Sequence, residues 1–422
     1  MNKKVLILAE AMMPYCNDWG SCQRVYHYSL KLISEGYAVS VICRNSSPNP
    51  AGEADVNGIK VLTPEGAKTA RNGKPSLRSK AIRFCKENKL VLSLLQKIYR
   101  FAYSEPNLFR GKESRQWAQN NKQFIKDYIS QEKTDVVIIS GPPFGLFYLA
   151  GEIKQLGVKL VLDYRDPWNL WYEKKSLCEK YEKGAVENAD LVIASTVNMA
   201  NGLKEKYNKD HIHPILNGYD IAAWENQEQC ARVREKDKLV ISYVGYILVN
   251  HPPAFRDPRC FIETACEFLE SRDDVEINFI GVGDDLATID DRFKSKINFK
   301  NRVPVEEALK AVNDSDVALV IHTAKDSSGN YIVCGKLYDY LKSGKYVLSV
   351  GDKAQCNNDL IDRYNVGFHC NNDRKSILES LELIYKKWEE NMLKADVPDD
   401  MIRYSREYQN TEFVKLMDSM NR

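Results

Sequence analysis

Short apolar runs alternate with longer amphipathic segments along most of the chain. The runs lie at residues 5–9, 38–43, 58–62, 136–140, 159–162 and 191–194, and again at 239–244, 276–280, 317–321 and 346–350. They are rich in β-branched residues and are separated by segments with helical spacing, which is typical of βα units in parallel sheets. The pattern therefore predicts an α/β protein with two successive doubly wound units.

A polar, charge-rich stretch at residues 225–238 separates the two groups of predicted strands. We therefore expect an N-terminal Rossmann-like domain at 1–222, a linker at 223–238 and a C-terminal Rossmann-like domain at 239–398. The last segment, 399–422, is expected to form a helix that packs back toward the N-terminal domain. Ligands of doubly wound sheets bind beyond the carboxyl ends of the strands, so a cleft between the domains is the expected site.

The composition agrees with a folded protein of two domains. The 422 residues are 44% hydrophobic and 28% charged, which excludes a disordered chain, a collagen and a small disulfide scaffold. The net charge of +2 argues against a nucleic-acid binder. Eleven cysteines occur without a C-x-x-C pair, so we expect free thiols in a reducing cytoplasm.

The charge is unevenly distributed along the chain. Residues 68–115, within an expected insertion at 64–115, carry 13 Lys and Arg against three acidic residues, which leaves −8 for the other residues. Apolar residues recur at helical spacing between 91 and 102, with aromatic residues beside them. A basic amphipathic helix is typical of a membrane-surface element. The alternative is a core helix with a solvated basic face.

Neither a leader nor a membrane span is expected. The first apolar run stops after five residues at Glu10, too short for a signal peptide, and no run approaches the ~18 residues of a spanning helix. A metal site is not expected either, because His211 and His213 are too few for zinc and Asp284-Asp285 is a weak candidate.

Two loops that follow predicted N-terminal strands carry candidate chemistry. Gly20-Ser21 begins a helix, where free backbone amides can bind an anion; the alternative is a plain βα turn. Asp163, Arg165 and Asp166 come directly after a strand. These charges either line the cleft or form a structural ion pair between Arg165 and one of the two aspartates.

Two further loops follow strands of the C-terminal half. Gly281 and Gly283 allow a ligand to approach the backbone closely. Ser327–Tyr331 leads into a helix on which Lys336 and Asp339 share one face. This carboxylate could accept the hydroxyls of a ribose and this lysine could hold a diphosphate; the alternative is a surface ion pair.

Several motifs occur together in an order that resembles a known family. They are D-Y-R-D-P-W at 163–168, N-G-Y-D at 217–220, Y-V-G-Y at 243–246, R-D-P at 256–258 and G-K-L-Y-D-Y-L at 335–341. Over nearly the whole chain, the sequence resembles the family 4 nucleotide-sugar glycosyltransferases of the GT-B fold, of the bacterial surface-polysaccharide type. The resemblance implies two Rossmann-like domains that face each other across a cleft.

The resemblance also implies roles for individual residues. Asp339 stands where the family has the second acid of its E-x7-E motif, which binds the ribose. Tyr331 stands at the first acid, with Asn330 or the 327–329 loop as substitutes. Arg256 and Lys336 would neutralise the diphosphate. The implied catalytic residues are Arg165, Asp166, Arg256 and Lys336; the implied donor-binding residues are Gly20, Ser21, Gly245, Gly281, Gly283, Ser328, Gly329, Asn330, Tyr331, Lys336, Leu337 and Asp339.

The expected function is therefore that of a hexosyltransferase-like enzyme in polysaccharide or glycolipid biosynthesis. It would move a sugar from a nucleotide sugar, with UDP as the expected nucleotide, to a glycan or lipid-linked acceptor with retention of configuration. No cofactor or metal is expected, and the expected location is cytoplasmic and peripheral on the inner membrane face. The alternatives are a sugar-nucleotide 2-epimerase on the same fold and a non-catalytic GT-B scaffold.

Overall fold

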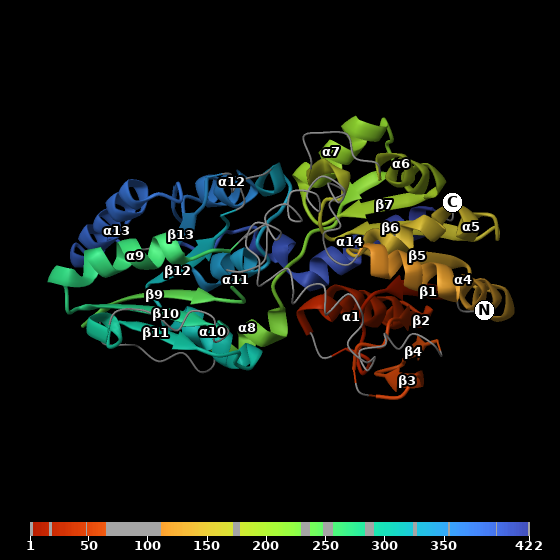
Figure 1. Cartoon of the computed structure of the whole chain (residues 1–422), viewed down its shortest axis with the longest axis horizontal. Helices are drawn as coiled ribbons and strands as arrows, with labels where there is room; N and C mark the ends of the chain where they lie inside the picture. Colours follow the sequence, from red (N-terminus) through yellow and green to blue (C-terminus); the bar gives the residue numbers. More distant parts are fainter. Residues whose placement is uncertain are drawn as a thin grey trace, which may run out of the picture.

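Two α/β domains lie side by side in the computed structural model (Figure 1). The structure describes residues 3–16, 19–47, 49–64, 111–171, 178–228, 237–247, 256–282, 291–323, 327–352, 355–393 and 395–420. Of the basic segment 68–115, only residues 111–115 fall within these ranges, so the interpretation of the rest lies outside the described residues.

The N-terminal domain is built on an eight-stranded sheet of order β3-β4-β2-β1-β5-β6-β7-β8. Every neighbouring pair is parallel except β3 and β4. Its strands are β1 (Lys4–Ala9), β2 (Ala38–Cys43), β3 (Gly52–Val56), β4 (Ile59–Thr63), β5 (Val136–Gly141), β6 (Lys159–Tyr164), β7 (Leu191–Ala194) and β8 (Ile212–Pro214).

Helices cover both faces of this sheet, which explains why its central strands are apolar at nearly every position. Leu6 and Leu8 belong to one hydrophobic cluster, and Val5 and Ile7 belong to another. The helical segments are α1 (Trp19–Ser34), α4 (Gly111–Glu132), η1 (Phe144–Leu149), α5 (Ala150–Lys154), η2 (Asn169–Trp171), α6 (Glu179–Asn188) and α7 (Val197–Tyr207).

The C-terminal domain has a six-stranded parallel sheet of order β11-β10-β9-β12-β13-β14. The strands are β9 (Leu239–Val244), β10 (Val275–Ile280), β11 (Ile297–Lys300), β12 (Val317–Ile321), β13 (Tyr346–Val350) and β14 (Gly367–Cys370). The helical segments are α8 (Ile221–Glu228), α9 (Arg259–Phe268), η3 (Leu269–Ser271), η5 (Asp291–Phe293), α10 (Val305–Asn313), η6 (Ser327–Asn330), α11 (Lys336–Ser343), α12 (Gln355–Tyr364) and α13 (Arg374–Glu389).

The predicted fold class is confirmed, and every predicted strand is present. The apolar pattern missed β3, β8, β11 and β14, each of which forms an edge of its sheet. These strands have few fully buried positions, because an edge strand has one neighbour and faces solvent. Hydrophobic patterning detects a strand only when it is buried.

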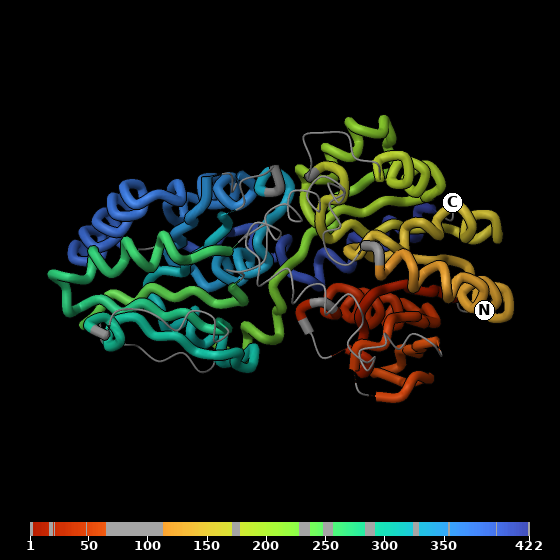
Figure 2. The backbone as a smooth tube through the Cα atoms, in the orientation of Figure 1, coloured from red at the N-terminus to blue at the C-terminus, as the bar shows by residue number. Residues whose placement is uncertain are grey.

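The chain passes between the domains twice, and the two passages are joined. The first runs through 215–220 into α8; the second runs from η7 (Met401–Tyr404) into α14 (Arg406–Ser419). Tyr219 donates its N–H to the carbonyl of Tyr404 at 3.0 Å and accepts from the N–H of Arg406 at 2.9 Å. Figure 2 shows the C-terminal segment returning to the N-terminal domain, where Phe413 of α14 stacks on Tyr28 of α1.

Part of the expected linker is helical, because residues 221–228 form α8. Trp224 of this helix is 2% exposed and belongs to a hydrophobic cluster of the C-terminal domain. Residues 229–236 lie outside the described ranges. No helix within the described ranges combines the length and apolar character that crossing a membrane requires.

Candidate functional site

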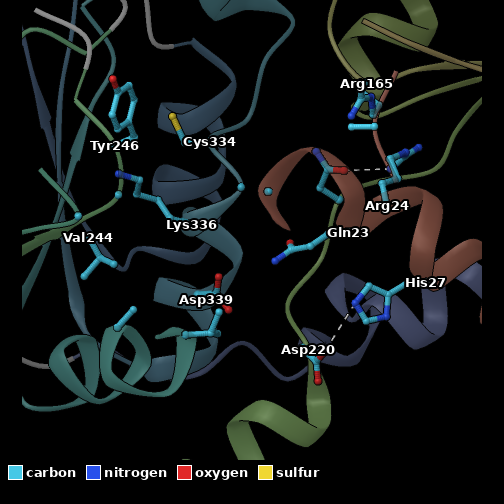
Figure 3. Close-up of a pocket in the computed structure, with 18 of the residues that line it drawn as sticks. Gln23, Arg24, His27, Arg165, Asp220, Val244, Tyr246, Cys334, Lys336 and Asp339 are labelled. Carbon is cyan, nitrogen blue, oxygen red and sulfur yellow. Dashed lines mark hydrogen bonds and ion pairs between the residues drawn. The ribbon is translucent and has the colours of Figure 1, made fainter. Parts of the chain in front are cut away.

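A cavity of about 2700 Å³ lies between the two sheets and is lined by both domains. The N-terminal wall comes from α1, the loop after β6 and the crossing segment 216–220. The C-terminal wall comes from the ends of β9 and β10, one face of α10 and the start of α11. Figure 3 shows Lys336 and Asp339 on one wall and Arg24 and Arg165 on the other. The carboxyl ends of parallel strands meet here, which is where such sheets bind ligands.

Lys336, the first residue of α11, brings a buried cation to this cavity. Its Nζ atom has no hydrogen-bond partner among the described residues and lies 3.5 Å from the centroid of the Tyr243 ring. Burial lowers the pKa of Lys336 well below its usual range, and the nearby Arg256 lowers it further. An anion bound at Nζ would supply a hydrogen-bond acceptor and raise this pKa.

Gly245, directly after β9, makes the buried position of Lys336 sterically possible. Its φ is +136°, a conformation that favours glycine, and a Cβ atom there would lie 2.7 Å from Nζ of Lys336. The Gly245 N–H donates to the carbonyl of Ile280 at 2.7 Å, and Gly281 lies against the Gly245 backbone. Backbone therefore forms much of this wall, and a ligand can approach it closely.

Asp339 lies one helical turn after Lys336 and also lines the cavity. The indole Nε1 of Trp224 donates to its Oδ1 at 2.9 Å. Burial raises the pKa of Asp339 to about 6, with a further increase from Asp220, while Trp224 and Arg406 oppose the shift. The carboxylate is therefore held in a fixed orientation and titrates close to neutral pH.

Arg165 and Asp166 reach the cavity from the opposite wall. The Arg165 guanidinium donates to the carbonyl of Pro142, and the Arg165 carbonyl accepts from Oγ of Ser195 at 2.6 Å. Burial raises the pKa of Asp166, whereas Arg165 and Arg256 oppose that rise. Because Arg256 belongs to the other domain, its electrostatic effect on Asp166 indicates that the two walls approach each other here.

Asp163, by contrast, forms a structural ion pair with Arg24 rather than with Arg165. Arg24 Nε donates to Asp163 at 3.0 Å, and Ser140 donates to the second carboxylate oxygen at 2.8 Å. The Arg24 guanidinium also donates to Oδ1 of Asn217 at 3.0 Å. One arginine on α1 thus joins the end of β6 to the interdomain crossing, and sequence reasoning did not detect it.

The remaining implied donor residues are not all brought to the cavity. Gly20 lines it, Ser21 lies in α1 and Ser328 lies in η6, and Gly283 lies outside the described residues. Leu337 is completely buried in the hydrophobic core. Gly329, Asn330 and Tyr331 are absent from the lining and belong to a segment that contacts the N-terminal domain.

A buried thiol beside Lys336 was not singled out from the sequence. Cys334 lines the cavity, and its Sγ lies 3.8 Å from Nδ1 of His322. Although burial raises it, the pKa of the Cys334 thiol is lowered to about 6, because His322, Arg256 and Lys336 stabilise the thiolate. His322 directly follows β12, and Arg256 comes from the segment before α9. Because these groups are not part of one local motif, the sequence alone did not indicate this environment.

No disulfide bond joins the cysteines within the described ranges. Among the residues that the structure describes, no three His, Cys, Asp or Glu side chains are grouped so that they could hold a metal ion.

Comparisons with known proteins agree with this architecture. Residues 20–223 match the family model described as Glycosyltransferase Family 4, whereas no curated protein matches the sequence. The chain is similar to a UDP-forming α,α-trehalose-phosphate synthase from Burkholderia xenovorans, at 12% identity and a TM-score of 0.63 over 100% of both chains. It is also similar to HepE of Anabaena, solved in complex with UDP, at 13% identity and a TM-score of 0.58 over 99% of this chain and 100% of that chain.

A third similar structure is a candidate UDP-N-acetylglucosamine 2-epimerase from Listeria monocytogenes, at 13% identity and a TM-score of 0.52 over 99% of this chain and 96% of that chain. At these identities the likeness to solved structures shows the fold alone. The family match adds the enzyme class over the N-terminal domain and the first crossing segment. The chain is therefore a glycosyltransferase of the GT-B fold, in which residues 20–223 resemble Glycosyltransferase Family 4.

Proposed function

We propose that the enzyme transfers a sugar from a UDP-sugar to an acceptor held against the N-terminal wall, with retention of configuration. The observation that carries this proposal is the buried Nζ of Lys336, which lacks a hydrogen-bond partner among the described residues and shares the cavity with Arg256 and Asp166. UDP is proposed because two similar structures are named for UDP or contain it.

The chemistry requires this cation at the leaving group. Breaking the anomeric C–O bond of a nucleotide sugar places growing negative charge on the diphosphate. We propose that Lys336 and Arg256 stabilise that charge, since one fixed donor typically contributes about 3–4 kcal/mol to the transition state. With these two cations present, we propose that the reaction needs no divalent metal and that EDTA leaves its rate unchanged.

Asp339 is proposed to accept the two hydroxyls of the donor ribose. Its carboxylate lines the same cavity as Lys336, and the Trp224 indole holds one of its oxygens at 2.9 Å. The second oxygen can then face the ligand. Asp166 is proposed to orient the acceptor hydroxyl or receive its proton.

We propose a glycan or lipid-linked acceptor from a bacterial surface-polysaccharide or glycolipid pathway, used at the inner membrane face. The support for the membrane is the net charge of +10 over residues 68–115, since each cation near an anionic leaflet contributes about 1 kcal/mol. Arg115 is an exception among these cations, because it already has an aromatic partner: its guanidinium lies 4.3 Å from the centroid of the Tyr148 ring. Salt-sensitive co-sedimentation with anionic liposomes is the expected result, and its absence would contradict membrane docking.

A panel of nucleotide sugars tests the donor and the reaction together. We expect one UDP-sugar to be hydrolysed slowly without acceptor, releasing free sugar and UDP. Recovery of a 2-epimerised nucleotide sugar would favour the epimerase alternative, which the Listeria similarity keeps as a second candidate. No turnover, together with no thermal shift from UDP, GDP or ADP, would favour a non-catalytic scaffold.

A further inference from the structure

A second contact joins the domains, separate from the two chain crossings. The carbonyl of Tyr331, directly after η6, accepts a hydrogen bond of 2.7 Å from Oγ1 of Thr196 in the N-terminal domain. The same oxygen of Thr196 accepts from the N–H of Met199 at 3.1 Å and so caps α7. Thr196 is 3% exposed. The Thr196 hydroxyl therefore caps α7 by accepting one hydrogen bond, and it binds the C-terminal domain by donating another.

The ring of Tyr331 packs into a space that a glycine leaves open. Tyr331 lies against the hydrophobic core of the N-terminal domain. A Cβ atom at Gly202 of α7 would lie 2.9 Å from Cε1 of Tyr331 and 3.2 Å from Cδ1 of Leu170. Any larger residue at position 202 would therefore displace the ring.

A buried thiol extends the same contact. Asn198 of α7 donates to Sγ of Cys356 at 3.3 Å, and Sγ donates to the carbonyl of Asn330 at 3.0 Å. Burial raises the pKa of Cys356 to about 12, so it keeps the proton that it donates. The start of α12 and η6 are thereby both bound to α7, and Figure 1 shows α12 and α7 facing each other at the domain boundary.

This contact connects directly to both walls of the cavity. Ser195, the residue before Thr196, donates to the carbonyl of Arg165 at 2.6 Å. On the other side, residues 332–336, which follow Tyr331, line the cavity and end at Lys336. Two consecutive hydroxyl residues therefore hold the loop of Arg165 and the segment that leads to Lys336.

We propose that Tyr331 is a positioning residue that sets the separation between Arg165–Asp166 and Lys336 by anchoring the C-terminal domain to α7. The effect of this anchor on sugar transfer rests on the proposed function. Its effect on the arrangement of the two domains does not. Although the residue stands where the resemblance implies a donor-binding acid, its ring and carbonyl both contact the N-terminal domain.

Paired glycine variants test the anchor. Gly202→Ala places a methyl group against Tyr331, whereas Gly184→Ala in α6 meets no atom within 4 Å. In the ligand-free full chain, we expect small-angle X-ray scattering to give a larger radius of gyration for G202A than for wild type and G184A. An unchanged radius for G202A would overturn the proposal.

A second pair tests the hydrogen bond without removing the helix cap. Thr196→Ser keeps both roles of the hydroxyl, whereas Thr196→Asp caps α7 well but has no proton to donate to Tyr331. We expect T196D to increase the amide exchange rate of residues 327–335 about fivefold, in line with the loss of one hydrogen bond, and T196S to leave it unchanged. Equal exchange in T196D and wild type would overturn the proposal even if G202A failed to fold.

A catalytic readout distinguishes positioning from a structural role. With the UDP-sugar that wild type hydrolyses, G202A and T196D are expected to lower acceptor transfer several-fold relative to donor hydrolysis, while UDP affinity stays as in wild type. The positioning role would be overturned if a variant with a larger radius of gyration or faster amide exchange kept the wild-type ratio of transfer to hydrolysis. If wild type turned over no nucleotide sugar, the proposed function would fail, and scattering and exchange would still decide the anchor.

Discussion

Two arginines on the N-terminal wall of the cavity and one lysine on its C-terminal wall differ in whether the fold supplies their partner. On the N-terminal wall, Arg24 is paired with Asp163 at 3.0 Å, with side-chain exposures of 8% and 0%, and Arg44 is paired with Glu10 at 3.1 Å. On the C-terminal wall, Nζ of Lys336 has no hydrogen-bond partner among the described residues.

The difference separates structural charge from functional charge. A buried charge needs a partner; Arg24 has one within the fold, whereas Lys336 can obtain one from a ligand. Arg24 and Arg44 of the N-terminal wall are balanced within the fold, whereas Lys336 of the C-terminal wall suits an anionic ligand. Replacing the paired Arg24 should therefore lower the free energy of unfolding, whereas replacing Lys336 should weaken ligand binding.

The largest effect is expected from removing the paired cation. Arg24→Met leaves the carboxylate of Asp163 buried without its cation, and loss of one partner from a buried pair typically costs about 3–5 kcal/mol. Urea denaturation should show this loss in the free energy of unfolding. The matched control is Arg374→Met, which breaks an exposed pair with Glu267 and should cost less than about 1 kcal/mol. Similar losses in the two variants would refute the assignment of Arg24 as a structural cation.

An effect on activity alone is expected from Asp166→Asn. If Asp166 orients the acceptor or receives its proton, transfer should fall about 10²–10⁴-fold, while donor hydrolysis and the free energy of unfolding change little. Separate assays of transfer and hydrolysis measure this difference. Unchanged transfer would remove Asp166 from the mechanism.

The smallest effect is a shift in pH dependence. The pKa of Asp339 is about 6, so the ionised form that accepts ribose hydroxyls is lost as the pH falls through 6, and UDP affinity should fall with it. Trp224→Phe removes a hydrogen bond that stabilises the carboxylate and should move the midpoint upward by about one pH unit. Asp220 and Arg406, the other charged groups that influence Asp339, remain in place.

Calorimetric titration of UDP between pH 5 and pH 8 in wild type and W224F measures the midpoint. Trp388→Phe on α13, remote from Asp339 in the C-terminal core, serves as the control. A midpoint common to all three proteins would show that Trp224 does not tune Asp339.

The sequence predicts most of the architecture because buried strands and strand-end loops leave local signals. The runs that became β1 and β9 are apolar at almost every position. Arg165 and Asp166 directly follow β6, and Lys336 begins α11. Edge strands such as β14, with no fully buried residue, leave too weak a pattern to detect.

Long-range pairing could not be predicted in this way. Arg24 and Asp163 are 139 residues apart, and Thr196 and Tyr331 are 135 residues apart. Only the folded chain brings each pair together. Local spacing offered Arg165 as a partner of Asp163, and the family resemblance implied a donor contact for Tyr331. The sequence shows which chemical group stands at each position, whereas the partner that determines the role of that group can lie far away along the chain.

The most direct test of the central claim is the affinity for UDP of Lys336→Met compared with Lys386→Met, whose lysine is exposed on α13. Calorimetry should show UDP binding weakened about 10²-fold in K336M, in line with loss of a charge-assisted contact, while its free energy of unfolding stays equal or rises. K386M should match wild type in both. UDP binding that is equal in K336M and wild type would contradict the account.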